Sequence, residues 1–286
     1  MTDTTTDREI KICCATFYQS DLVRMLLGDV FHPGGLTLTR YLGEVIGLGP
    51  GDRVLDVACG RGASSAHLAE QFGCHVTSLD YGPENIAAAE AHAANKSVAH
   101  LTTFRQGDAE GLPFDEGAFD AVISECSFCT FPDKAMATAE MARVLRCPEP
   151  FDVTQDKPAE GRSGGRLGLT DMTISGPLPE DIQSLLAWVA CVAGAGTPED
   201  YVATLRKAGF AGFTVEDHRD VLLGMVDDVR RKLLGVELAV GLGKLDLGEL
   251  DLSEGKHQAR RAVELIEGGT VGYTLITARK AVLVAR

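Results

Sequence analysis

The sequence predicts an α/β protein built on a seven-stranded, mostly parallel sheet that is flanked by helices. Short apolar runs such as RVLDVA at 53–58 alternate with stretches of roughly 10 to 15 residues that have helical spacing. Continuous apolar runs are typical of strands buried on both faces of a parallel sheet. The closing run GYTLITARKAVLVA at 272–285 is rich in β-branched residues and would complete the sheet.

The N-terminal region 1–49 is predicted to be a helical cap. Apolar spacing predicts a helix over 10–27, which FHPGG at 31–35 ends, and a second helix over Leu36–Ile46. The next region, 50–175, is predicted to form the core of the sheet. Its predicted helices are Ala63–Phe72, Pro83–Asn95 and Met136–Leu145, and its predicted strands are 53–58, 75–79, 101–105, 119–124 and 166–174.

Two further segments complete the plan of the chain. CPEPFDVTQDKPAEGRS at 147–163 has three prolines and little periodicity, so we expect a surface loop there. Region 176–286 is predicted to combine a helical cap over the substrate with the final strands of the sheet. Its helical pattern runs over 176–268 and is interrupted by a strand at 213–217.

The charge balance narrows the classes of partner. Lys and Arg number 27 against 41 Asp and Glu, giving a formal charge of −14. Binding to nucleic acid or to an anionic membrane relies on Lys and Arg, so neither partner is expected. The N-terminus resembles no signal peptide, and no apolar stretch approaches the ~20 residues of a membrane span. We therefore expect a cytoplasmic protein whose eight cysteines are reduced thiols.

The most informative motif is VLDVACGRG at 54–62, between the first strand and the following helix. Small residues at Ala58, Gly60 and Gly62 let the backbone turn tightly and approach a ligand, and the helix N-terminus offers unpaired N–H groups. Phosphate binding and a purely structural turn are both compatible with this motif. It departs from the GxGxxG pattern of dinucleotide-binding proteins because Ala58 holds the first position.

Carboxylates follow the next two strands. Asp80 ends the second strand, about 20 residues after the glycine turn, where a carboxylate can accept hydrogen bonds from vicinal ribose hydroxyls. Its alternative role is to cap the helix that starts near Pro83. Asp108 follows the third strand, where it could accept a hydrogen bond from an adenine amino group between apolar neighbours such as Ala109.

Together these motifs resemble those of the class I S-adenosylmethionine (SAM) methyltransferases of the type 11, UbiE-like group, which have a Rossmann-like fold. VLDVACGRG resembles their first motif, GDAEGLPF at 107–114 their adenine-binding segment, and FDAVISE at 119–125 their fourth-strand motif. The resemblance implies SAM as cofactor and assigns the methionine end to Asp56, Gly60 and Gly62, the ribose to Asp80, and the adenine to Asp108. The remaining residues of the implied cofactor set are Ala58, Tyr81, Ala109 and Glu125. RVLR at 143–146 departs from the family pattern because an inserted loop separates it from Gly164 and Gly165.

The cysteines point to the acceptor. Cys126 and Cys129 form a CxxC just after the fourth predicted strand, beside the expected position of the transferable methyl group. Cys126 before PDK at 132–134, and Cys191 before a Gly/Ala-rich turn, resemble cysteines of arsenite methyltransferases. Trivalent arsenic is thiophilic, and its methylation needs positioning but no general base. The hypothesis is an arsenic site formed by Cys126 and Cys191 with Cys13 or Cys14, and with Cys129 as a further candidate.

Three alternatives remain at this point. Cys13, Cys14, Cys126 and Cys129 could hold a structural zinc ion. The enzyme could instead methylate oxygen, nitrogen or carbon of a small metabolite, with Glu125, Tyr18, His32 or Tyr41 as base or positioning group. Glu125 could also bind the methionine amino group of SAM. A noncatalytic SAM-binding or metalloid-sensing protein is the third alternative, and it would bind without turnover.

Overall fold

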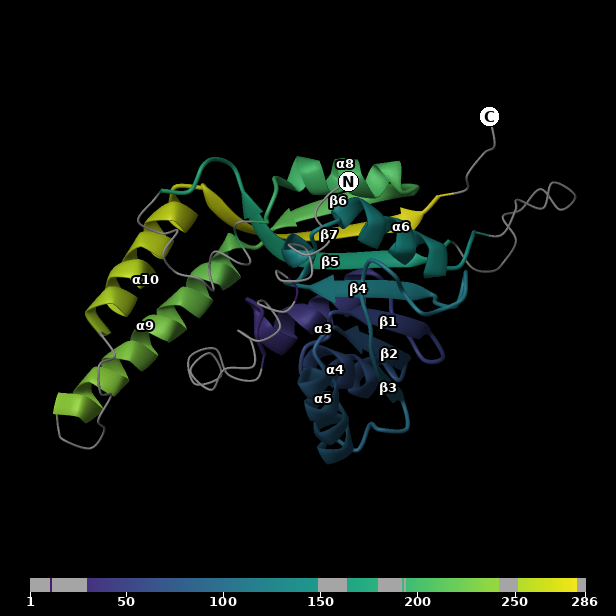
Figure 1. Cartoon of the computed structure of the whole chain (residues 1–286), viewed down its shortest axis with the longest axis horizontal. Coiled ribbons are helices and arrows are strands. Elements are labelled where there is room, and N and C mark those ends of the chain that lie inside the picture. Colours follow the sequence, from purple (N-terminus) through teal and green to yellow (C-terminus); the bar gives the residue numbers. More distant parts are fainter. Residues whose placement is uncertain are drawn as a thin grey trace, which may run out of the picture.

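The chain folds around one seven-stranded sheet with strand order β3-β2-β1-β4-β5-β7-β6 (Figure 1). This computed structural model describes residues 11, 30–148, 164–179, 192, 194–241 and 252–281. The strands are β1 Arg53–Val57, β2 His75–Asp80, β3 Thr102–Gln106, β4 Ala121–Glu125, β5 Arg166–Ile174, β6 Phe210–Asp217 and β7 Val271–Lys280.

The sheet is mostly parallel, as predicted. β1 to β5 pair in parallel, whereas β7 inserts antiparallel between β5 and β6. The chain starts in the middle at β1, runs outward to β3, and then returns to β4 on the other side of β1. This reversal creates a crevice beyond the carboxyl ends of β1 and β4, which is where ligands bind in open α/β sheets.

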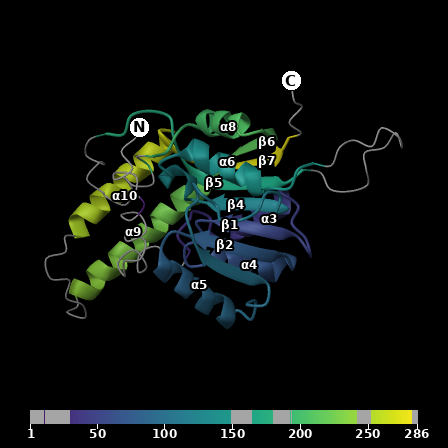
Figure 2. The same cartoon turned by 45° about the vertical axis from the view of Figure 1, so that its right-hand side comes forward.

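Helices cover both faces of the sheet (Figure 2). One face carries α3 Gly35–Val45, α4 Ala63–Phe72 and α5 Pro83–Asn95, and the other carries α6 Lys134–Val144 and α8 Pro198–Lys207. Because side chains alternate along a strand, β1 sends Val54 into one core cluster and Leu55 and Val57 into the other. This two-sided burial explains why RVLDV reads as a continuous apolar run.

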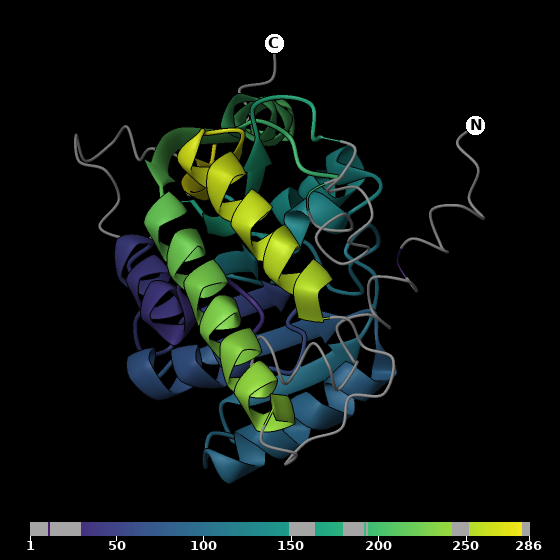
Figure 3. The same ribbon diagram turned by 90° about the vertical axis from the view of Figure 1, so that its left-hand side faces the viewer.

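A helical hairpin extends beyond the carboxyl edge of the sheet. α9 Arg219–Gly241 follows β6 and α10 Leu252–Glu267 precedes β7, so the hairpin is an insertion between these two strands. The two helices lie side by side across this edge (Figure 3). Within the described residues, no helix is both long and apolar enough to cross a membrane.

The predicted elements are confirmed wherever the structure describes them. The bounds of α4, α5 and β5 match the predicted ranges, and β6 begins three residues before the predicted strand at 213–217. Region 176–286 supplies β6, α8 and β7 to the sheet layers as well as the hairpin. The predicted helix over 10–27 lies outside the described residues except for Lys11, and so does the loop at 147–163 except for Cys147 and Pro148.

Candidate active site

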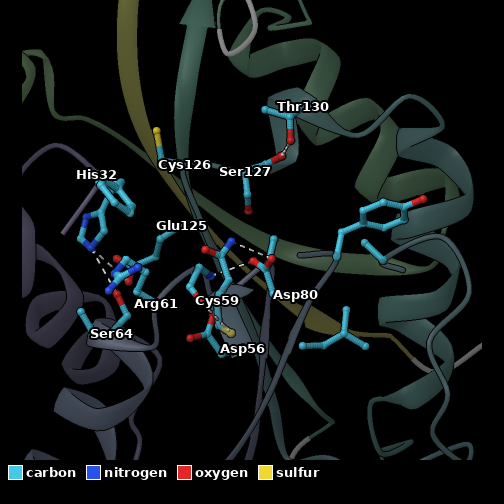
Figure 4. A pocket seen from close by; sticks show the side chains of 18 of the residues that line it. His32, Asp56, Cys59, Arg61, Ser64, Asp80, Glu125, Cys126, Ser127 and Thr130 are labelled. Atoms are coloured by element: carbon cyan, nitrogen blue, oxygen red, sulfur yellow. Dashed lines mark hydrogen bonds and ion pairs between the residues drawn. The ribbon is translucent and has the colours of Figure 1, made fainter. Parts of the chain in front are cut away.

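A pocket opens at the carboxyl edge of the sheet, where β1, β2 and β4 end (Figure 4). Four segments that are far apart in the sequence line it, with residues drawn from 56–64, 79–85, 107–109 and 125–131. Lys11 and His32 from the N-terminal region also line it. All nine residues of the expected cofactor set except Gly62 line this pocket, and Gly62 is the N-cap of α4.

The turn between β1 and α4 depends on its small residues. Ala58, Gly60 and Gly62 all have positive φ, at 62°, 53° and 75°. A Cβ at Gly62 would lie 2.6 Å from the Cβ of Ala89 and 2.9 Å from Cε1 of Phe104, so packing against α5 and β3 also requires glycine. A Cβ at Gly60 would meet nothing within 4 Å, so this backbone is open to a ligand. The turn therefore fits a cofactor that lies close to the main chain.

Asp80 ties the glycine turn to the end of β2. Its Oδ2 accepts a hydrogen bond from Gly60 N at 2.8 Å, and its Oδ1 accepts from Gly82 N at 2.8 Å and from the Asn85 side chain at 2.9 Å. The N-cap of α5 is Gly82 and no side chain caps this helix, so Asp80 does not have the alternative capping role; its bonds go to the Gly82 N–H and the Asn85 side chain, and Asp80 lines the pocket. Burial raises the pKa of Asp80, although these three donors oppose that effect.

Asp56 is the most deeply buried carboxyl group of the pocket, with 2% of its surface exposed. Ser65 of α4 donates a hydrogen bond of 2.5 Å to its Oδ2. Burial raises the pKa of Asp56 to about 7, and the negative charges of Glu125 and Asp80 add to the rise. A cationic ligand would reverse this effect because it favours the ionised carboxylate.

Glu125 ends β4 and is anchored by α3. Thr39 Oγ1 lies 3.2 Å and 2.9 Å from its two carboxylate oxygens and donates to them. His32 Nε2 lies 3.7 Å from Glu125 Oε2 and 3.2 Å from the Ser64 hydroxyl. His32 Nδ1 lies 3.2 Å from the carbonyl oxygen of Pro33, which can only accept, so Nδ1 carries the proton. The hydroxyl of Thr39 lies 3.3 Å from the same Nε2 atom.

The Asp108 end of the pocket contains an ion pair that the sequence did not predict. Lys11 Nζ lies 2.8 Å from Asp108 Oδ2 and 2.6 Å from Glu110 Oε2. These carboxylates raise the pKa of Lys11, although burial opposes them. Asp108 still lines the pocket together with Tyr81 and Ala109, so one carboxylate serves both the N-terminal region and the pocket.

Cys126 places a thiol in the pocket immediately after β4. Its backbone has φ of 53°, which is rare for a residue with a side chain, and its N–H donates to Thr170 O at 2.6 Å. Such conformations persist where the surrounding structure enforces them, and they cluster at functional sites. Figure 4 places Cys126 on the same side of the pocket as His32, with Glu125 between this side and Asp80.

Five of the seven other cysteines fall into three groups, and the remaining two, Cys74 and Cys147, do not line the pocket. Cys129 is only 1% exposed and does not line the pocket, so the pair of the CxxC motif is divided between pocket and interior. Cys59 lines the pocket, but burial beside Asp56 and Asp80 raises its pKa and disfavours the thiolate. Cys13, Cys14 and Cys191 lie outside the described residues. No group of three or more His, Cys, Asp or Glu side chains within the described ranges could hold a metal ion.

The candidate bases of the organic-acceptor alternative have different positions. His32 lines the pocket, whereas Tyr41 is exposed, donates to Glu216 at 3.0 Å and does not line it. The expectation for Tyr41 is therefore wrong, because its side chain is directed to the outer surface of α3 and β6. Tyr18 lies outside the described residues.

Sequence reasoning missed Lys11, Thr39 and Ser64 as residues of this site. Thr39 lies 86 positions from Glu125 along the chain, and Lys11 lies 97 positions from Asp108. No local spacing links such pairs. The only available signal was the helical pattern of Leu36–Ile46, which places Thr39 and Leu42 on one face but does not identify the partner.

Comparisons with known proteins identify the family. The model of the methyltransferase domain family matches residues 55–147. A sarcosine/dimethylglycine N-methyltransferase of Halorhodospira halochloris is 30% identical over 237 residues, which cover 79% of this chain and 73% of that protein. An arsenite methyltransferase of Halobacterium salinarum is 32% identical over 166 residues, which cover 57% of this chain and 38% of that protein.

The fold has close structural relatives. A structure of Haemonchus contortus phosphoethanolamine N-methyltransferase 2 in complex with SAM has a TM-score of 0.76 at 18% identity, covering 95% of this chain and 60% of that one. At this identity the likeness concerns the fold alone. Combined with the match over most of the bacterial N-methyltransferase, it shows that the chain belongs to the class I SAM-dependent methyltransferases, whose cofactor is SAM.

Proposed function

We propose that this methyltransferase methylates trivalent arsenic, with Cys126 as a thiolate ligand of the acceptor. The observation that carries the proposal is the Cys126 thiol in the cofactor pocket, held there by a left-handed backbone at the end of β4. A soft, thiophilic acceptor is what a pocket thiol binds best. Thiolates also leave the arsenic lone pair available for the methyl group.

The pocket residues on the side away from Cys126 fit SAM. The open backbone at Gly60 would admit the methionine end, the Asp80 carboxylate would bind the ribose, and Asp108 with Ala109 would hold the adenine. Asp56 and Glu125 would supply negative charge for the sulfonium and the amino group. The chemistry that SAM supplies when bound is an electrophilic methyl group on a positively charged sulfur. Because arsenic(III) carries no proton to remove, the chain has to position the acceptor and exclude water.

Described residues just after Cys191 in the sequence contact the loop that carries Cys126, and this supports the same proposal. Val192 directly follows Cys191 in the sequence, and Gly194 comes two residues later. Val192 belongs to the buried cluster that contains Cys129, and a side chain at Gly194 would collide with the carbonyl oxygen of Cys129. The segment after Cys191 is thus packed against the loop that carries Cys126. The arsenite methyltransferase of H. salinarum adds support from sequence.

The test is SAM turnover by the thiol-reduced protein with and without arsenite, with methylated arsenicals separated from S-adenosylhomocysteine. We expect methylarsenicals that depend on arsenite, and their loss in Cys126→Ser and Cys191→Ser. Cys147→Ser is the matched control, because Cys147 is exposed and lies outside the pocket. Unchanged arsenite methylation by Cys126→Ser would refute the site.

A small organic amine is the second candidate acceptor. It is favoured by the 30% identical relative named for sarcosine and dimethylglycine, and by the carboxylates Asp56, Asp80 and Glu125, which suit a cation. The same assay separates the two candidates, since sarcosine or dimethylglycine replaces arsenite as acceptor. Turnover of an amine that survives Cys126→Ser would favour this candidate over arsenic.

A further inference from the structure

Two loops meet beside the part of the pocket that contains Cys126, called here the acceptor side. The first loop, residues 126–131, follows β4, contains the short helix η1 Phe128–Thr130, and carries both cysteines of the CxxC motif. The second, residues 194–197, is the turn that leads into α8. Gly194 packs directly on the carbonyl group of Cys129, where a side chain would collide. The contact brings together segments that are about 65 residues apart in the sequence.

Lys134, at the start of α6, fastens the first loop. Its Nζ donates hydrogen bonds to Cys129 O at 2.9 Å and to Phe131 O at 3.0 Å. A Cβ at Gly194 would lie 3.6 Å from the same Nζ, so the ammonium group sits where both loops meet. Burial lowers the pKa of Lys134, whereas Cys129, Asp171 and Glu110 favour its charged form.

Asp171 and Tyr201 fasten the same two loops to β5. Asp171 Oδ2 accepts a hydrogen bond from Cys129 N at 3.1 Å. The hydroxyl of Tyr201, which is 2% exposed, donates to Met172 O at 3.0 Å and accepts from Gly196 N at 3.3 Å. The Tyr201 ring also meets Phe128 edge to face, with ring centroids 5.2 Å apart. One tyrosine therefore contacts both loops and the strand between them.

We infer that Lys134, Asp171 and Tyr201 form a clamp that holds the Cys126 loop against the turn after Cys191, and so act as positioning residues for the methyl acceptor. The role in acceptor binding rests on the proposed function. In this clamp, Lys134 of the PDK sequence holds the Cys126 loop, a role that the position of Lys134 in the sequence does not indicate. Buried carbonyl groups need donors, and the single ammonium group of Lys134 serves the carbonyl groups of both Cys129 and Phe131.

The test uses Lys134→Met, which keeps the aliphatic length and removes both hydrogen bonds. Lys207→Met is the matched control, because Lys207 is exposed in the last turn of α8. The first readout is the rate at which N-ethylmaleimide labels each cysteine, mapped by mass spectrometry without arsenite. Cys129 is 1% exposed and Cys74 is fully buried elsewhere in the core, so Cys74 reports global opening.

We expect Lys134→Met to label Cys129 roughly tenfold to a hundredfold faster while Cys74 stays protected, because two hydrogen bonds of about 1 kcal/mol each are lost. The KM for arsenite should rise roughly 10- to 100-fold with little change in SAM affinity, as for residues that orient metal ligands. Lys134→Arg should recover most of the loss, since a guanidinium group also donates to two carbonyls. Tyr201→Phe should raise Cys129 labelling by a smaller factor.

Labelling and turnover separate this inference from the proposed function. Labelling of Cys129 at the wild-type rate in Lys134→Met would overturn the clamp, and so would equally fast labelling of Cys74 and Cys129 in both the Lys134 and Tyr201 variants. Faster labelling with an unchanged KM for arsenite would overturn the positioning role. A wild-type protein that does not methylate arsenite would refute the proposed function, while selective Cys129 labelling would still support the clamp.

Discussion

The cofactor side and the acceptor side of the pocket are built in different ways. The glycine-turn part of the cofactor side is local, because Asp56, Gly60 and Asp80 lie within 25 residues of one another, in one strand–turn–helix–strand unit whose backbone donors bind its own carboxylate. On the acceptor side, the Cys126 loop depends on Lys134, Asp171 and Tyr201, which come from α6, β5 and α8. A local unit can stay constant while the remote clamp varies. The difference predicts that contacts on the acceptor side can change while the glycine turn stays the same.

The largest effect should come from Asp80→Ala. The substitution removes an acceptor of three hydrogen bonds, including the one to Gly60 N, so the turn loses its tie to β2. Hydrogen bonds to a charged group contribute about 1.5–3 kcal/mol each, so SAM should bind at least about 100-fold more weakly. Calorimetric titration with SAM measures this. Asp115→Ala, at an exposed carboxylate, is the control.

Asp80→Ala also tests whether the two sides are independent. Maleimide labelling of Cys126 and Cys129 in Asp80→Ala should match the wild type, because the clamp draws on no residue of the glycine turn. If labelling of Cys129 rose together with the loss of SAM affinity, the two sides would form one cooperative unit. The conclusion that the two sides are built independently would then be wrong.

The same difference decides what the sequence could predict. The ranges of α4, α5 and β5 followed from apolar runs bounded by glycine or proline, and the glycine turn followed from small residues at adjacent positions. The division of the CxxC pair did not follow, because the burial of Cys129 depends on Gly194 and Asp171. Spacing reports contacts within one element, whereas these contacts depend on how distant elements pack.

A smaller, graded effect should follow from the pKa of Asp56, which is about 7. Below pH 7 the carboxyl group is protonated, and binding of the SAM cation has to expel that proton. SAM affinity should therefore fall by up to about tenfold per pH unit below 7. Binding titrations between pH 5.5 and 8 test this, and Asp56→Asn should flatten the profile. A flat wild-type profile would mean that Asp56 is ionised throughout.

Stability without ligand should change in the opposite direction. The pKa of Asp56 is raised above its ordinary value of 3.8, so the folded state holds this proton more tightly than the unfolded state. The stabilisation is fully present below about pH 4 and is lost as the pH rises toward 7. The difference in free energy of unfolding between the wild type and Asp56→Asn should therefore become smaller as the pH rises from 4 to 7. Urea denaturation of both proteins at several pH values would measure this difference.

The smallest effect should come from Thr39→Val, which probes the boundary between the two sides. Valine keeps the shape of this fully buried residue but removes the donor to both oxygens of Glu125. If Glu125 serves the amino group of SAM, the Kd of SAM should rise about threefold to tenfold, in line with one hydrogen bond of about 1 kcal/mol, while the KM for arsenite stays constant. Thr37→Val, exposed on the same helix, is the control. A rise in the KM for arsenite with an unchanged Kd of SAM would instead assign Glu125 to the acceptor. The end of β4 would then belong to the acceptor side, and the cofactor side would no longer include Glu125.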